Sequence, residues 1–201
     1  MRTPPALHFA AASLVLTASL SSVAALQSVT RQDADRFEQK LRVIERRGEQ
    51  RSGPALRTPV TESEVNSYLA LSSGWFMPAG VVGSRLSISG EDRVAGRAVV
   101  DLDEVRRAQK PGLLNPLNYL SGRVPVAAQG VIRAGGGVAR FELESADVGG
   151  VPIPKRVLQE IVAYYTRSPD YPNGVNLDDP FPLPARIRAI EIRPREAIVV
   201  Q

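Results

Sequence analysis

The sequence predicts an α+β domain in which antiparallel β-hairpins pack against one long amphipathic helix, with a charged helix ahead of them. Three observations carry this prediction. The stretches 84–102 and 124–144 alternate apolar and polar residues around glycine-containing turns, which is typical of β-hairpins. The stretch 151–167 places its apolar residues at helical spacing on one face. The stretch 31–51 is rich in charge and has a narrow apolar stripe at the same spacing.

The first 25 residues have the composition of a secretory signal peptide. Arg2 supplies the positive end, residues 9–20 the apolar core, and residues 23–25 a small-residue site for cleavage after Ala25. An uncleaved membrane anchor is the alternative, although the apolar run is short for the ~20 residues that span a bilayer. We therefore expect an exported protein of the periplasm or cell envelope.

This interpretation divides the chain into three parts, with boundaries that follow from composition. They are a signal peptide at 1–25, a charged leader helix and linker at 26–57, and the α+β domain at 58–201.

The chain after the signal peptide lacks two residue types that carry much of catalytic chemistry. His8 is the only histidine and lies in the signal peptide, and the sequence has no cysteine. This composition excludes thiol nucleophiles, histidine-based triads, cysteine/histidine zinc sites and disulfides. An exported domain without disulfides has to rest on its hydrophobic core, which a chain of 201 residues can form.

The charge balance is mildly basic. Of the 25 basic residues only Arg2 lies in the signal peptide, which leaves 24 against 21 acidic residues. Such a balance suits an anionic membrane surface or nucleic acid, and an ordinary solvated surface is the third interpretation. An exported chain meets lipid headgroups more readily than nucleic acid, so we expect no nucleic-acid partner.

The charged stretch 31–51 is the first expected helix, and its stripe consists of Ala34, Phe37, Leu41 and Ile44. Three interpretations of this helix stay open. It docks weakly on the domain as a solvated helix, it binds a membrane surface or a partner, or it is a partly disordered tether.

A capping box starts the second expected helix. The Thr61 hydroxyl and the Glu64 carboxylate satisfy free amide donors reciprocally, and the helix runs to about Ser72. Trp75 and Phe76 follow on a loop. They are a plug of the core, an exposed wedge for a membrane, or the rim of a pocket.

Each of the two hairpins is expected to have one apolar face. Small residues share this face with larger aliphatic ones, namely Gly96 and Ala98 in the first hairpin and Ala128 and Gly130 in the second. Small residues allow a helix to pack closely, or they leave an apolar cavity. Both alternatives stay open.

The long helix at 151–167 begins at Pro152 and Pro154, because a proline in the first turn gives up no intrahelical donor. Ser168 and Pro169 end it. A loop rich in proline, asparagine and aspartate follows, and a closing hairpin is expected over 187–200.

Two acidic clusters are the remaining candidates for chemistry. Two carboxylates are enough for glycoside hydrolysis, as at Asp101 and Asp103, and Asp178, Asp179 and Asn176 offer hard oxygen ligands for calcium. Such short spacing is more typical of hydrated turns, so we expect no catalytic residue, no metal and no cofactor. The glycine run 135–137 lacks the ending of a phosphate-binding loop.

Several segments together resemble a known group of proteins. They are TESEVNSYL at 61–69, VAGRAVVDLD at 94–103, SGRVPVAAQGVIRAGGGVARFELESADVGGVPIP at 121–154 and LPARIRAIEIRPREAIVV at 183–200. Behind a signal peptide, this series resembles exported bacterial proteins of the LmeA-like and YceB-like kind. Their fold is similar to the tubular lipid-binding domains of the BPI group. The resemblance covers about 60–201 and excludes the charged leader helix.

The resemblance implies a long, strongly curved antiparallel sheet that wraps around the long helix, with acyl chains of phospholipid or another lipid in the groove between them. It implies a non-enzymatic protein whose partners are lipid or a membrane surface, and envelope proteins in addition, with arginines near the groove rim meeting headgroup phosphate. An envelope scaffold or assembly factor with a filled groove is the alternative. The lipid-binding residues that it implies are Leu86, Ile88, Val100, Val126, Ile132, Phe141 and Leu143 from the strands, Val157, Leu158, Ile161, Val162 and Tyr165 from the helix, and Trp75, Phe76 and Phe181 at the mouth.

Overall fold

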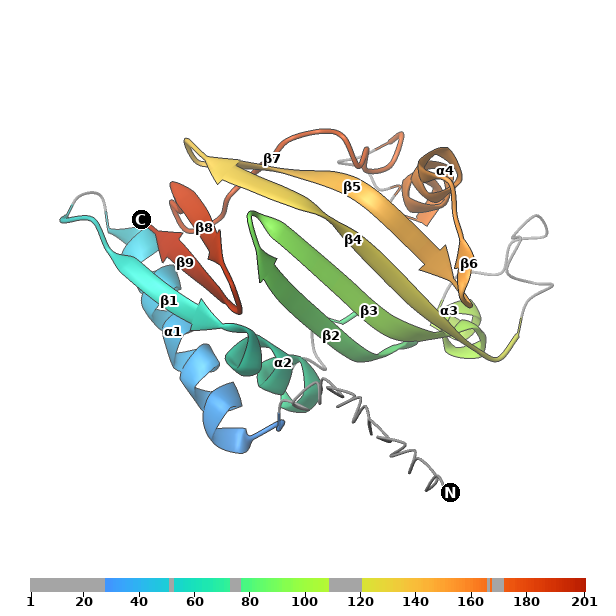
Figure 1. Cartoon of the computed structure of the whole chain (residues 1–201), viewed down its shortest axis with the longest axis horizontal. Helices are drawn as coiled ribbons and strands as arrows, with labels where there is room; N and C mark the ends of the chain where they lie inside the picture. The colour runs from blue at the N-terminus through green and yellow to red at the C-terminus, as the bar shows by residue number, and fades with distance from the viewer. Residues whose placement is uncertain (1–27, 51–52, 73–76, 109–120, 166, 168–171) are drawn as a thin grey trace, which may run out of the picture.

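The computed structural model describes residues 28–50, 53–72, 77–108, 121–165, 167 and 172–201, and it confirms an α+β fold with a large antiparallel sheet (Figure 1). The described residues form four helices and nine strands. The helices are α1 (Arg31–Glu49), α2 (Glu62–Leu71), α3 (Leu102–Ala108) and α4 (Lys155–Tyr165). The strands are β1 (Arg57–Thr61), β2 (Val81–Gly90), β3 (Arg93–Asp101), β4 (Arg123–Gly135), β5 (Val138–Val148), β6 (Val151–Pro152), β7 (Phe181–Pro182), β8 (Ala189–Arg193) and β9 (Glu196–Val200).

The sheet is open and branches at β4. The strand order is β1-β9-β8-β4-β3-β2, and β5 pairs with β4 and carries β6 and β7 on its outer side. Strand β8 joins β4 through one register pair, Ala134 with Ile190, beyond the part of β4 that pairs with β3. The long strands β2 to β5, with β6 and β7 along the outer side of β5, therefore form one wing of the molecule, and β1, β8 and β9 form another with α1 and α2 (Figure 1).

Three hairpins end in two-residue turns whose residues all have positive φ. The turn residues are Glu91 and Asp92 (φ 51° and 61°), Gly136 and Gly137 (63° and 83°), and Gly149 and Gly150 (64° and 81°). Turns of this kind match the right-handed twist of the flanking strands. The two hairpins expected from the alternating pattern are confirmed as β2–β3 and β4–β5, and the closing hairpin as β8–β9.

The best-buried part of the core lies where α1 and α2 meet the short strands. Ala34 is 0% exposed and Tyr68 6%, and the rings of Phe37 and Tyr68 meet edge to face at 5.1 Å. The apolar stripe of α1 thus faces inward, so the charged leader helix packs as part of the domain. The capping box at Thr61 and Glu64 is confirmed at the start of α2.

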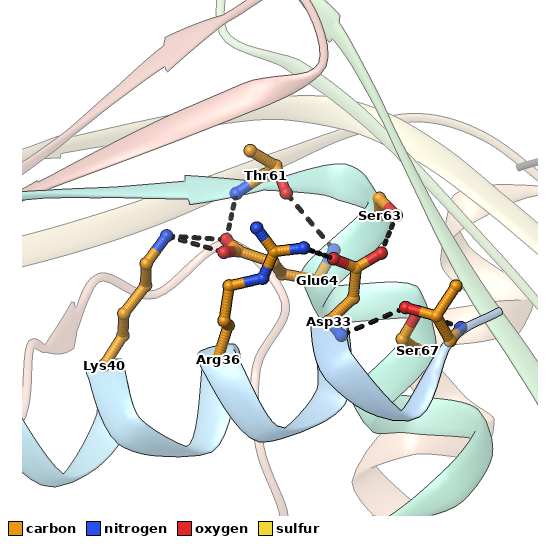
Figure 2. Close-up of polar contacts among 8 residues, drawn as sticks. Asp33, Arg36, Lys40, Thr61, Ser63, Glu64 and Ser67 are labelled. Atoms are coloured by element: carbon orange, nitrogen blue, oxygen red, sulfur yellow. Dashed lines mark hydrogen bonds and ion pairs between the residues drawn. The ribbon is translucent and has the colours of Figure 1, made fainter. Parts of the chain in front are cut away.

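Polar contacts join α1 to α2 in addition to the apolar core (Figure 2). The Ser63 hydroxyl donates to Asp33 at 2.8 Å, and the Thr30 backbone N–H donates to the Ser67 hydroxyl at 3.1 Å. Ser67 is fully buried at 0% exposure, and its partner lies 37 residues away in the chain. These long-range contacts fix the position of α1 on the domain.

Two boundaries differ from the sequence-based expectation. Residues Val151 and Pro152 form strand β6 and not the start of a helix, because the turn at Gly149–Gly150 folds the chain back along β5. Helix α4 begins at Lys155 and lies beside β5 at the edge of the sheet (Figure 1). Strand β1 was not expected, since a Pro-containing segment of five residues has little alternation. No helix in the described part of the chain is long and apolar enough to span a membrane.

Candidate functional site

The pairing register places the expected strand residues together on one face of the β2–β5 wing. Leu86 pairs with Gly96, which pairs with Ala128, and Ile132 pairs with Phe141. Directly paired residues point to the same side of a sheet. By this register all seven strand residues assigned to a lipid site share one face, which we call the apolar face: Leu86, Ile88, Val100, Val126, Ile132, Phe141 and Leu143.

The apolar face is only partly covered. Ile88 is 3% exposed, because α2 packs against this end of β2, whereas Val100, Val126, Ile132 and Leu143 are half-buried. The middle of the wing thus presents aliphatic side chains that keep contact with solvent. A sheet face that only served as core would show fully buried side chains here.

The two glycines of the apolar face differ in their surroundings. At Gly130 a Cβ would lie 2.3 Å from the backbone carbonyl oxygen of Glu142 and 2.7 Å from the ring of Phe141, so β5 leaves no room for a side chain at this position. At Gly96 a Cβ would meet nothing within 4 Å, and Gly96 is exposed. Among the described residues no helix packs on Gly96, which leaves a strip of open apolar face between Leu86 and Ala128.

The α4 residues expected at the site are not all directed at the sheet. Leu158 and Val162 are half-buried, whereas Val157 and Ile161 are 43% and 42% exposed. Helix α4 contacts β5, the outermost long strand, and a loop packs along its other side: the Gln159 side chain donates to the Val175 carbonyl at 3.0 Å. Helix α4 therefore has one apolar edge, with Leu158 and Val162, that is half-buried, and a second apolar edge, with Val157 and Ile161, that is exposed to solvent.

Of the residues expected at the mouth of the groove, the structure describes only Phe181. Phe181 lies on β7, paired with Ala139, and is 44% exposed. Trp75 and Phe76, and the side chain of Tyr165, lie outside the described residues. The structure thus brings together the strand set and places the helix set beside it at the sheet edge.

One feature of the site was missed because a β-bulge changes the phase of β5. Gly130 pairs with Leu143 and Gln129 with Ser145, so Glu144 is the extra residue. Beyond the bulge Ala146 and Val148 point to the apolar face, where simple alternation from Leu143 would have placed Ser145. The signal in the sequence is the polar pair Glu144–Ser145, which breaks the alternation.

The opposite face of the wing is polar and holds the strand arginines. Ion pairs on this face include Arg93 with Glu144 at 3.2 Å, Arg123 with Asp101 at 3.2 Å and Arg133 with Glu142 at 3.3 Å. The strand arginines thus lie on the far side of the sheet from the apolar face. A hollow of about 210 Å³ is lined mainly by polar-face residues, Ser87, Ala95, Arg97, Ala127, Gln129, Ser145 and Asp147, and it also reaches Gly96 and Ala128 of the apolar-face register.

The two acidic clusters have structural partners. Asp101 accepts the Glu104 backbone N–H at 3.1 Å at the start of α3, and this bond, together with Arg123, holds the pKa of Asp101 below its usual value. Asp178 pairs with Lys155, and Asp179 accepts the Asn176 side-chain amide at 2.9 Å. These contacts fix a helix start and the loop beside α4.

Comparisons with protein-family models, with curated proteins and with solved structures found no match to this chain.

Proposed function

We propose that this protein binds or carries an acyl lipid, such as a phospholipid, on the apolar face of β2–β5, and that it does so as an exported, non-enzymatic protein without metal or cofactor. The observation that carries the proposal is the open strip at Gly96. A row of half-buried aliphatic side chains borders a position over which no described residue packs. An acyl chain bound on this strip would remove the half-buried aliphatic side chains from contact with water.

The dimensions of the strip suit an acyl chain. Strand β3 has nine residues and so spans about 30 Å at ~3.4 Å per residue. One leaflet of a bilayer core is about 15 Å thick, so the acyl chains that fill it reach over a shorter distance than the length of β3. Each buried methylene contributes about 0.8 kcal/mol, which makes a chain of ordinary length a strong ligand.

The likeness to LmeA-like and YceB-like proteins, which rests on sequence motifs, supports the same proposal. A sheet wrapped around α4 is the finer architecture that this resemblance implies. We propose this architecture as well, together with lipid or a membrane surface as the partner and the cell envelope as the location.

A scaffold that acts through surface contacts is the second candidate function. The exposed apolar edge of α4 favours it, since Val157 and Ile161 lie one helical turn apart and reach solvent together. In this case envelope proteins would be the partners and the apolar face would need no ligand.

Neighbouring alanines of β4 provide a matched test of the proposal. Ala128 lies on the apolar face between Gly96 and Ala146, and Ala127 lies on the polar face between Arg97 and Asp147. Both are half-buried, and an aspartate at 128 would place a charge on the open strip. We expect Ala128→Asp to weaken binding of a fluorescent fatty acid by about ten-fold or more, equal to ~1.4 kcal/mol, and Ala127→Asp to leave it unchanged.

Fluorescence titration of the two variants and the unaltered protein measures this difference, with circular dichroism as the check of folding. Equal affinity in both variants, or no binding by the unaltered protein, would contradict the proposal.

A further inference from the structure

Strands β6 and β7 are two pieces of one interrupted strand. Both run antiparallel to β5 along its outer side: Val151 pairs with Val148 at one end, and Phe181 pairs with Ala139 at the other. The chain leaves this line after Ile153, whose N–H donates to the Ala146 carbonyl at 2.9 Å, and returns to it at Phe181. Helix α4 lies in the excursion between them (Figure 1).

The interruption leaves a gap of six β5 residues, Arg140 to Ser145. No hydrogen bond from a described residue reaches the outer side of the β5 backbone there, because the pairing to β7 ends at Ala139 and the bond from Ile153 falls on Ala146. Six residues of strand span about 20 Å. In this stretch the side chains of Glu142, Glu144 and Ser145 are exposed on the polar side, and α4 contacts β5.

The opposite edge of the same wing is closed at two positions of β2, Leu86 and Ile88. On β2 the Asn66 side-chain amide donates to the Leu86 carbonyl at 2.8 Å and accepts the Leu86 N–H at 2.7 Å, as a neighbouring strand would do. Glu62 accepts the Ile88 N–H at 2.7 Å. Natural proteins block edges in this way because an unpaired edge is a template for another strand.

We propose that the gap at Arg140–Ser145 binds a short extended segment of a partner protein, which adds as a strand between β6 and β7 and presents an acidic side chain to Arg140. This inference does not rest on lipid binding, since it concerns the sheet edge and not the apolar face. Strand addition of this kind takes its affinity from backbone hydrogen bonds and its specificity from alternate side chains.

The length of the gap decides which occupant fits. A second copy that offered its own β5 would bring a strand of 11 residues into a gap of six, and its ends would meet β6 and β7. A peptide tail or loop of about six residues has no such conflict. The occupant is therefore a short segment, and a β5–β5 dimer is excluded.

The charges on the polar face indicate which side chain the bound segment should place there. Glu142 is held by Arg133 and Glu144 by Arg93, whereas no ion pair joins Arg140 to a described residue. Arg133 and Arg140 are directly paired in the register, and among the described residues Glu142 pairs with Arg133 alone, so a further carboxylate beside Arg140 would be favourable.

A hollow of about 620 Å³ adjoins this end of the gap and offers room for a carboxylate. Arg133, Arg140 and Pro180 line it, together with the acidic side chains of Asp92 and Glu191. Glu191 is already held by Arg57 at 2.5 Å. On the apolar face the half-buried Phe141 and Leu143 favour apolar residues at the alternate positions of the segment.

The test uses random heptapeptides displayed on phage, selected on the purified protein and then synthesised with blocked ends. We expect peptides that alternate apolar and polar residues and carry an acidic side chain. Fluorescence anisotropy should show affinity lower by about ten-fold or more for Arg140→Glu, and unchanged for Arg85→Glu on the closed edge strand and for Ala128→Asp on the apolar face.

Backbone N-methylation of the selected peptides distinguishes strand addition from simple charge attraction. Methylation of alternate residues should abolish binding in one phase and preserve it in the other, because only alternate N–H groups face β5. A selection that returns no peptide, or peptides that are indifferent to Arg140→Glu and to the phase of methylation, would overturn the proposal.

Discussion

Lys40 of α1 donates to both carboxylate oxygens of Glu64 in α2, at 2.8 Å to each (Figure 2). The Glu64 side chain is 5% exposed and also accepts the Thr61 N–H at 2.9 Å. One carboxylate therefore closes the capping box of α2 and anchors the charged helix α1. This relationship makes α1 a structural part of the domain.

Loss of the Glu64 carboxylate should destabilise the protein strongly. Glu64→Ala removes the capping box and leaves Lys40, whose side chain is 27% exposed, without this acceptor. We expect a loss of about 3 kcal/mol in the free energy of unfolding, measured by urea denaturation. Glu38→Ala, which removes an exposed pair with Arg42 on the same helix, should change it by less than about 0.5 kcal/mol. Equal losses in both variants would contradict this account.

The acid sensitivity of the α1–α2 contact should depend on Asp33. The Ser63 hydroxyl above all, with Thr30 and Arg36, holds the pKa of Asp33 below its ordinary value of 3.8. The folded pKa lies below the unfolded one, so the stabilisation is fully present above the unfolded pKa and is lost as the pH falls through the folded pKa. Asp33→Asn should therefore be less stable than the unaltered protein at pH 7, and the difference should shrink below about pH 4. Thermal unfolding as a function of pH measures it, and a difference that stays constant to pH 2.5 would refute the assignment.

The side chain of Asn66 in α2 should contribute to stability, because it is a buried polar group with hydrogen bonds to β2. Asn66 is 6% exposed and closes the β2 edge through two hydrogen bonds to Leu86. Asn66→Ala leaves the Leu86 backbone groups without these partners, and we expect a cost of about 2 kcal/mol in urea unfolding. Asn173→Ala, at an exposed position, serves as the control and should be near neutral. A neutral Asn66→Ala would mean that the edge is satisfied in another way.

The two glycines of the apolar face should respond oppositely to alanine. At Gly130 the added methyl group would meet the Glu142 backbone oxygen and the Phe141 ring, so Gly130→Ala should cost about 1–3 kcal/mol. At Gly96 it would meet no described residue, so Gly96→Ala should be neutral or stabilise by about 0.5 kcal/mol, since alanine restricts the unfolded chain. Thermal denaturation of the pair decides the matter. A strong loss at Gly96 would show that the apolar face is covered there.

Local patterns in the sequence predicted the elements that depend on neighbours in the chain. The capping box at Thr61 and Glu64 and the alternation of the two long hairpins are confirmed, because each depends on residues within a turn or a strand. The shared apolar face of Leu86 and Phe141 also followed, since period-two alternation fixes which side chains point together.

The features that the sequence pattern did not predict depend on contacts between residues far apart in the chain. The amphipathic face of α4 indicated burial, yet the position of the helix depends on the Gly149–Gly150 turn and on where β5 ends, and Ile161 reaches solvent. The buried Ser67 has its partner in another helix, and Glu144 is a bulge only because of its register with β4. Spacing within one segment carries no information about such partners.

Whether the apolar face of β2–β5 holds an acyl lipid can be measured by extracting the purified protein with organic solvent and analysing the extract by mass spectrometry. We predict a copurifying acyl lipid in roughly stoichiometric amount with the unaltered protein and with Ala127→Asp, and its loss from Ala128→Asp. An extract of the unaltered protein that contains no acyl lipid, together with failure to take up lipid from phospholipid vesicles, would contradict the claim.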